Sequence, residues 1–132
     1  GDWNARHGRG LALKLQGRYA EAVRAYLEII DANPLFHKAN NDLAWLLATC
    51  PNEAARDGRR AIEYATAACE QTGWKNSTYI DTLAAAYAES GQFEEALRYQ
   101  ALTLEDPVLQ GDRRTVARQR LELYRQKKPF RE

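Results

Sequence analysis

A short glycine-led pattern recurs along the chain and constrains its fold more than any other feature. The stretch from Gly91 to Leu97 reads Gly-Gln-Phe-Glu-Glu-Ala-Leu, and the stretch from Gly17 to Val23 reads Gly-Arg-Tyr-Ala-Glu-Ala-Val. In both copies a glycine, which can end a helix, comes before an aromatic residue and a small alanine of the next apolar stretch. Small residues suit places where two helices approach closely. The pattern therefore predicts a helix-turn-helix unit that repeats.

A second set of matching positions lies before each turn and fixes the spacing of the repeat. The members are Leu83, Ala84 and Tyr87 in the last copy, Leu43, Ala44 and Leu47 in the middle copy, and Gly10 and Leu13 in the first. Ala44 follows Gly10 by 34 residues, whereas Ala84 follows Ala44 by 40 residues. The middle repeat is therefore expected to carry extra residues between its two helices.

This order of residues resembles the tetratricopeptide repeat (TPR), whose period is about 34 residues. Tyr26 and Pro34 also fall where the family has a later aromatic residue and a proline. The resemblance implies an all-α fold in one domain over 1–132. Its parts are three repeats at about 3–36, 37–75 and 76–108, an inter-helix insertion at 49–57, and a capping helix at about 112–127. In the family such repeats stack into a right-handed superhelix, a solenoid.

Turn residues and apolar periodicity predict where the seven helices begin and end. The expected helices are 3–16, 19–32, 36–49, 58–72, a fifth from about 78 to the turn at Gly91, 93–104, and 112–127. Asp57 is expected to cap the fourth helix, and Thr78 with Asp81 matches a capping box for the fifth. The helix at 36–49 is apolar nearly all round, so it is expected to pack on more than one side.

The first helix departs from the family at two positions. Arg6 and Arg9 stand where an aromatic residue and a leucine are expected. Two unpaired arginines would be costly to bury. The first helix is therefore either an exposed end or is covered by a further repeat upstream.

Composition limits the classes of partner. With 132 residues, 45% of them hydrophobic, and a net charge of +1, the chain can bury a core and has no overall field that attracts nucleic acid or an acidic membrane. It has no apolar run long enough to span a membrane, and no signal peptide precedes Trp3. Because it contains no methionine, we interpret it as a segment of a longer or processed protein, and its compartment stays open.

Charge is unevenly distributed near the end of the chain. Residues 76–111 contain six acidic residues and one arginine, whereas residues 112–132 contain eight basic and three acidic residues. The basic stretch could contact phosphates, or it could be a cap that balances the acidic third repeat. We favour the second interpretation, so nucleic acid is not an expected partner.

Few residues offer chemistry. His7 and His37 neighbour no serine or cysteine in sequence, and no cysteine or carboxylate cluster at ligand spacing accompanies them. Cys50 and Cys69 are expected near opposite ends of the antiparallel third and fourth helices, beyond disulfide reach, and are interpreted as small core or loop residues. We expect no cofactor, no metal and no enzymatic activity.

The TPR resemblance implies a concave groove lined by the first helix of each pair. The positions that correspond are Asn4, His7, Leu11, Lys14, Lys38, Asn41, Trp45, Asp81, Ala85 and Glu89. Trp45 could anchor an apolar side chain or a cation in this groove, or it could pack in the core. One branch of the family clamps the C-terminal carboxylate of chaperones, but the clamp positions here are His7, Leu11, Asp42, Thr78 and Thr82. None of these matches, so such a tail is not an expected partner.

The leading hypothesis is a non-catalytic protein-protein interaction module that holds a partner peptide or domain in this groove. The alternative is a structural module that self-associates through the ends of the superhelix. An enzymatic function comes last because no acid, base, nucleophile or metal set converges in the sequence.

Overall fold

The computed structural model describes residues 2–132 and consists of seven α-helices and one short 3₁₀ helix. The helices are α1 (Trp3–Leu15), α2 (Tyr19–Ala32), α3 (His37–Thr49), η1 (Glu53–Ala55), α4 (Gly58–Gln71), α5 (Ser77–Glu89), α6 (Phe93–Leu104) and α7 (Gly111–Arg125). No strand occurs within residues 2–132. The expected all-α class is confirmed.

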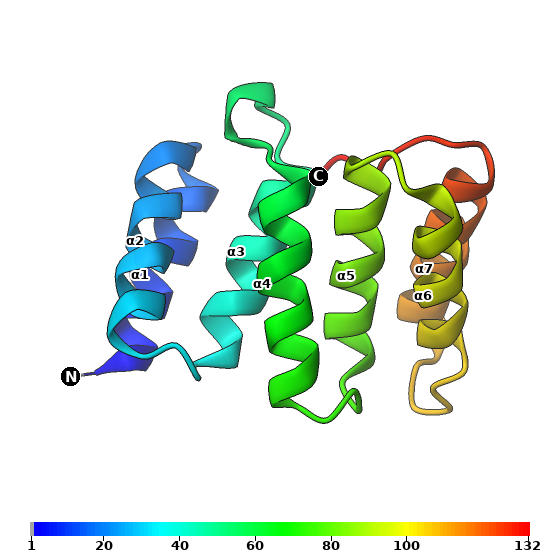
Figure 1. The fold of residues 1–132 in the computed structure, drawn as a ribbon, viewed down its shortest axis with the longest axis horizontal. Coiled ribbons are helices and arrows are strands. Elements are labelled where there is room, and N and C mark those ends of the chain that lie inside the picture. Colours follow the sequence, from blue (N-terminus) through cyan, green and yellow to red (C-terminus); the bar gives the residue numbers. More distant parts are fainter. Residues whose placement is uncertain (1) are drawn as a thin grey trace.

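The helices follow one another across the molecule in chain order (Figure 1). Consecutive helices pack against each other within α1–α2, α3–α4 and α5–α6, and α3 also packs directly against α5. In the view of Figure 1, α2, α4 and α6 lie nearer the viewer than α1, α3 and α7. We call the surface formed by α1, α3, α5 and α7, on the side away from α2, α4 and α6, the inner face.

The two glycine-led turns share one backbone geometry. Gly17 and Gly91 both have φ near 76°, a left-handed conformation that favours glycine. After α1, the Arg18 N–H donates to the Leu13 carbonyl at 2.9 Å, and after α5 the Gln92 N–H donates to the Tyr87 carbonyl at 2.9 Å. This is the Schellman arrangement that ends a helix. The recurrence in the sequence therefore reflects the same turn made twice.

Helix α3 lies at the centre of the core, and nine of its 13 residues are buried. Its side chains pack against α2, α4 and α5, and Leu43 and Ala44 have no exposed surface. The expectation that this helix packs on more than one side is confirmed. Cys50, just after α3, and Cys69 on α4 are both buried with free thiols, in keeping with their interpretation as small core residues.

The predicted capping box at the start of α5 is wrong. Asn76 caps this helix, because its side-chain oxygen accepts the N–H of Tyr79 at 3.2 Å. Thr78 lies inside the first turn, and Asp81 is turned into the protein, where it meets Gln100 and Arg120. An asparagine is as good an N-cap as a serine or threonine, and it comes first in the chain.

The start of α4 and the exposed side of α1 agree with what the sequence predicts. Asp57 caps α4 as predicted, since its side chain accepts the N–H of Arg60 at 3.2 Å. Arg6 and Arg9 are both exposed on α1, and the Arg6 guanidinium lies 5.0 Å from the centre of the Trp3 ring. Within residues 2–132, no helix is both long enough and apolar enough to cross a membrane.

Candidate functional site

Residues 128–132, which we call the return segment, run along the inner face near the ends of α3 and α5. Helix α7 ends at Arg125, and Lys127, with φ 57°, makes the same left-handed turn as the two glycines. The Lys128 N–H then donates to the Leu123 carbonyl at 3.1 Å. From this turn the chain runs back from α7 towards α3 as an extended segment (Figure 1).

Glu132 is bound by groups from two helices. Its side-chain oxygen Oε1 lies 2.6 Å from Nζ of Lys14 on α1, and Oε2 accepts a hydrogen bond from Nε1 of Trp45 on α3. Its backbone N–H donates to the carbonyl oxygen of Thr49 at 2.8 Å. The inner face therefore recognises both a side-chain carboxylate and the backbone of this residue.

Phe130 lies against an aromatic and cationic pair. Its ring centre is 5.7 Å from that of Trp45, and the Arg120 guanidinium lies 4.6 Å from the Phe130 ring and 4.9 Å from the Trp45 ring. A guanidinium at these distances from two ring faces is attracted to both. Asp81 holds Arg120 in place through a contact of 2.6 Å between Oδ2 and Nη1, and Oδ1 of Asp81 accepts from Gln100 at 2.9 Å.

Arg131 pairs with Glu89 at the end of α5. Nη1 of Arg131 lies 2.6 Å from Oε1 of Glu89, as an ion pair without a directed hydrogen bond. The second oxygen of Glu89 lies 3.5 Å from Nε of Arg56, and the Glu89 side chain is only 15% exposed. Glu89 is therefore held between two guanidinium groups, one from the return segment and one from the turn before α4.

The sequence-predicted groove residues divide into three sets. Lys14, Trp45 and Glu89 are brought together because each contacts the return segment, and Asp81 joins them through Arg120. Away from the return segment, His7 and Asn41 meet at Asp42, with His7 Nε2 2.6 Å from Oδ2 and Asn41 Nδ2 3.1 Å from Oδ1. The rest make no such contact. Asn4, Leu11 and Lys38 are exposed, and Ala85 is only 1% exposed in the core, so it offers no groove surface.

Four residues of this site were not singled out from the sequence: Arg120, Phe130, Arg131 and Glu132. Arg120 is one of five arginines in the helix expected at 112–127, and nothing in the sequence distinguishes it from the others. For the other three, the only signal was a short run after that helix in which an aromatic residue is flanked by charges. Such a run has no periodicity that would place it in space.

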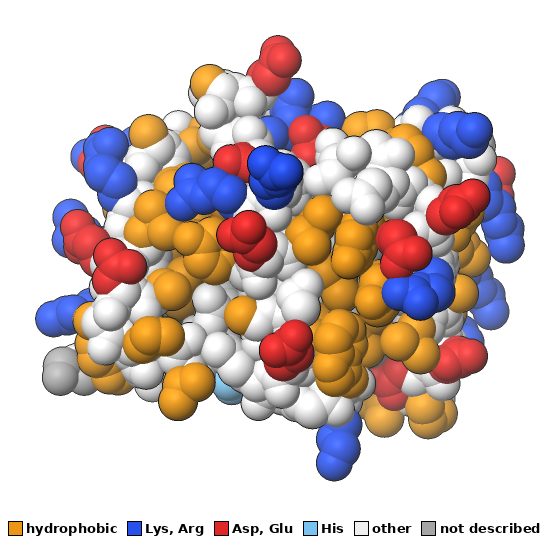
Figure 2. Space-filling model, in the orientation of Figure 1, with side chains coloured by type: hydrophobic (Ala, Val, Ile, Leu, Met, Phe, Trp, Pro, Cys, Tyr) orange, Lys and Arg blue, Asp and Glu red, His pale blue; other side chains and the backbone are white. Residues whose placement is uncertain are grey.

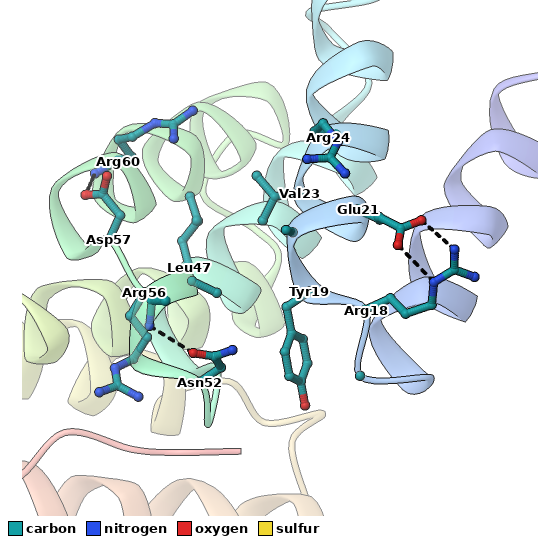
Figure 3. A pocket seen from close by; sticks show the side chains of 14 residues that line it. Arg18, Tyr19, Glu21, Val23, Arg24, Leu47, Asn52, Arg56, Asp57 and Arg60 are labelled. Carbon is teal, nitrogen blue, oxygen red and sulfur yellow. Dashed lines mark hydrogen bonds and ion pairs between the residues drawn. The ribbon is translucent and has the colours of Figure 1, made fainter.

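Two hollows lie near these helices. A cavity of about 280 Å³ lies between α5, α6 and α7 and is lined in part by Thr78, Asp81 and Arg120, so it adjoins the Phe130 site. A larger hollow of about 660 Å³ lies beside α2 and η1. Figure 3 shows its arginines, of which Arg18 is paired with Glu21 at 2.6 Å.

The arginines of the larger hollow are mostly committed to other groups. Arg56 donates to the Cys50 carbonyl at 2.8 Å and pairs with Glu89, and Arg60 lies 3.5 Å from the Tyr64 hydroxyl. Arg18 is held by its own pairing. The hollow therefore does not present a converging set of free donors for an anion.

The opposite surface, which is formed mainly by α2, α4 and α6 and which we call the outer face, carries a stack of aromatic rings. The ring of Tyr99 lies 5.6 Å from Tyr87 and 6.0 Å from Trp74, and both pairs are nearly parallel. Figure 2 shows apolar side chains gathered over the neighbouring helices on this face. Trp74 is 39% exposed. It provides a second partly exposed tryptophan for comparison with Trp45.

Burial keeps the candidate reactive groups protonated. It raises the pKa of the Cys69 thiol to about 12, with a smaller contribution from Glu70. Burial also raises the pKa of the Tyr26 phenol, and the carboxylates of Asp42 and Glu132 raise it further. At neutral pH neither group supplies the anion that a nucleophile needs. Within residues 2–132, no three side chains are grouped as they would be around a metal ion.

Comparison with known proteins assigns no family. No protein-family model matches the chain, and no curated protein matches it. What the chain does must therefore be inferred from the geometry of the inner face.

Proposed function

We propose that this chain is a non-catalytic protein-protein interaction module that binds a short extended peptide on its inner face. We further propose that its helices are three TPR repeats followed by α7 as a capping helix. The return segment is the observation that carries the proposal. It is itself an extended peptide, and the inner face contacts its backbone, its aromatic ring and both kinds of charge.

The contacts to the return segment combine apolar surface, hydrogen bonds and charge pairs, which are the interactions that bind peptides. Trp45 supplies a large apolar surface with one polar group, the type of side chain that dominates many binding sites. The ion pairs of Lys14 and Glu89 supply charge selectivity. Because these three residues come from α1, α3 and α5, a ligand that contacts all three must cross several helices, as an extended segment does.

The TPR part of the proposal is supported by the backbone. The two glycine turns that recur in the sequence have the same conformation and end α1 and α5, which are the first helices of the proposed first and third repeats. The residues that lengthen the middle repeat form the turn around η1, between α3 and α4.

A selection from a random peptide library displayed on phage tests this proposal. The target is the full chain with Phe130→Ala and Glu132→Gln, which we call the released variant because both changes weaken the return segment. We expect enriched peptides whose affinity falls at least about tenfold when Trp45→Ala is added. Trp74→Ala, a matched change on the outer face, should leave their affinity unchanged. Lys14→Glu gives a second inner-face change that does not open a cavity in the core.

The selection also gives a clear negative result. If no peptide is enriched, or if enriched peptides bind equally well after Trp45→Ala and Lys14→Glu, the inner face is not the binding site. Circular dichroism of each variant checks that its helices are intact.

Self-assembly through the two ends of the array of helices α1–α7 is the second candidate function. Leu11 and Leu15 are exposed at 39% and 76% on α1, which lies at one end of the row. Light scattering distinguishes the two functions. A molar mass that rises with concentration in the wild type, and that falls back to one chain in a Leu11→Ser, Leu15→Ser variant, would favour assembly.

A further inference from the structure

We propose that the return segment is a tethered occupant of the inner face, which a partner must displace, and that such partners carry an aromatic side chain with a carboxylate two residues later. This inference rests on the proposed function, since it concerns the same face. It adds a regulatory role for residues 128–132 and a chemical class for the partner: an extended peptide of the order aromatic, basic, acidic.

The spacing of the partner's residues follows from Trp45. Phe130 contacts the Trp45 ring, and Glu132 accepts from the indole N–H of the same residue. In an extended chain, side chains two residues apart point the same way. One tryptophan can therefore contact both an aromatic ring and a carboxylate when a single residue separates them, as Arg131 does here. The hydrogen bond from the Glu132 N–H to Thr49 fixes the register through the backbone.

The charge order of the partner follows from the charged side chains of the helices that contact the segment. Glu89 faces Arg131, and Lys14 faces Glu132, each with 2.6 Å between the charged atoms. A peptide with these two charges exchanged would place like charges in contact at both positions, which is destabilising. The central residue of the partner is therefore expected to be basic, and the last one acidic.

Tethering gives the return segment an advantage over a free peptide of the same sequence. The segment starts directly after the turn at Lys127, which the bond from Lys128 to Leu123 anchors to α7. A short tether corresponds to an effective concentration of the order of millimolar. A partner binds only while the segment is undocked, so its apparent affinity falls in proportion to the undocked fraction. If the face is free for about a tenth of the time, the apparent affinity falls about tenfold.

The test uses a defined probe: fluorescein-labelled Lys-Pro-Phe-Arg-Glu, amidated so that only the side-chain carboxylate is available. Fluorescence anisotropy measures its affinity for the wild type, for the released variant, and for Arg125→Ala as a matched control. Arg125 lies at the end of α7 and pairs with Glu122 on the surface, where both side chains are more than half exposed. We expect the released variant to bind the probe about tenfold tighter than the wild type and the control do.

Two further measurements test the parts of the inference separately. A probe with phenylalanine replaced by alanine, or one with arginine and glutamate exchanged, should bind the released variant at least about tenfold more weakly than the original probe. In the wild type, nuclear Overhauser contacts between the Phe130 and Trp45 rings should be visible, and saturating probe should remove them.

The outcomes separate this inference from the proposed function. If the released variant and the wild type bind the probe equally, the segment is not a competitor, although library peptides that depend on Trp45 would still support the proposed function. If the exchanged probe binds as well as the original, the assigned partner chemistry is wrong. If neither the probe nor any library peptide binds, the proposed function itself fails.

Discussion

The contact between Asp81 and Arg120 links the stability of the fold to the inner face. Asp81 on α5 lies 2.6 Å from Arg120 on α7, and it also accepts a hydrogen bond from Gln100 on α6 at 2.9 Å. The side chains of Asp81 and Arg120 are only 12% and 18% exposed. Asp81→Ala would therefore leave a nearly buried guanidinium without its anion, and the buried Gln100 amide would keep only the Ala117 carbonyl of its two acceptors.

The expected cost can be worked out from this burial. Removing one partner of a buried ion pair costs about 3–5 kcal/mol. Because Arg120 keeps some access to water, we expect Asp81→Ala to lower the free energy of unfolding by about 3 kcal/mol. The surface pair of Glu95 with Arg98 has almost the same length, 2.7 Å, but its side chains are 40% and 65% exposed. Glu95→Ala should therefore cost less than about 1 kcal/mol.

Urea denaturation followed by circular dichroism measures both losses. A double change, Asp81→Leu with Arg120→Met, tests whether the loss comes from the unpaired charge, because replacing both partners with apolar residues is often neutral. We expect the double variant to recover most of the loss caused by Asp81→Ala. If Asp81→Ala costs no more than Glu95→Ala, or if the double variant is the least stable, burial does not set the strength of this pair.

Three further predictions concern the fold. A Cβ atom at Gly10 would lie 2.6 Å from Cε1 of Tyr26, so Gly10→Ala should lower the free energy of unfolding by about 1–3 kcal/mol. A Cβ atom at Gly8, on the same helix, meets no atom within 4 Å, so Gly8→Ala should raise it by about 0.5–1 kcal/mol. Equal shifts of the melting temperature in the two variants would contradict this packing. Burial raises the pKa of Tyr26 above its unfolded value of 10.0, so the stability that this group contributes is complete below pH 10 and is lost as the pH rises further. Urea denaturation at a series of pH values should show that the free energy of unfolding falls less steeply above pH 10 in Tyr26→Phe than in the wild type. An equally steep fall in both would count against the raised pKa. Asn76→Ala should lower the free energy of unfolding by about 1 kcal/mol because α5 loses its cap, whereas Thr78→Ala should lower it by less than about 0.5 kcal/mol. A larger loss for Thr78→Ala in chemical denaturation would show that Thr78 is the cap.

The parts of the fold that depend on local rules could be predicted from the sequence. Gly17 and Gly91 end helices because the backbone there is left-handed, and the glycine itself reveals this requirement. The expected and observed bounds of α2 and α6 coincide, since turn residues and apolar spacing mark both ends.

The error at the start of α5 shows where local rules stop. Thr78 and Asp81 have the spacing of a capping box, but Asn76, two residues before Thr78, is also a residue type that caps helices well. Which of the two caps the helix depends on what Asp81 contacts, and its partners Gln100 and Arg120 come from α6 and α7. A pattern that is read within one helix contains no information about those contacts.

Beyond its local anchor at Lys128, the return segment is placed by contacts between residues distant in sequence. No periodicity marks residues 128–132, and the groups that hold them, Lys14, Trp45 and Glu89, come from three different helices. From the sequence alone, Trp45 could lie either in the groove or in the core. In the structure its indole is partly buried because Phe130 and Arg120 lie against it. If the segment undocks as we propose, the same indole gains exposure on the inner face, so the groove and core interpretations of Trp45 would describe the open and the covered face.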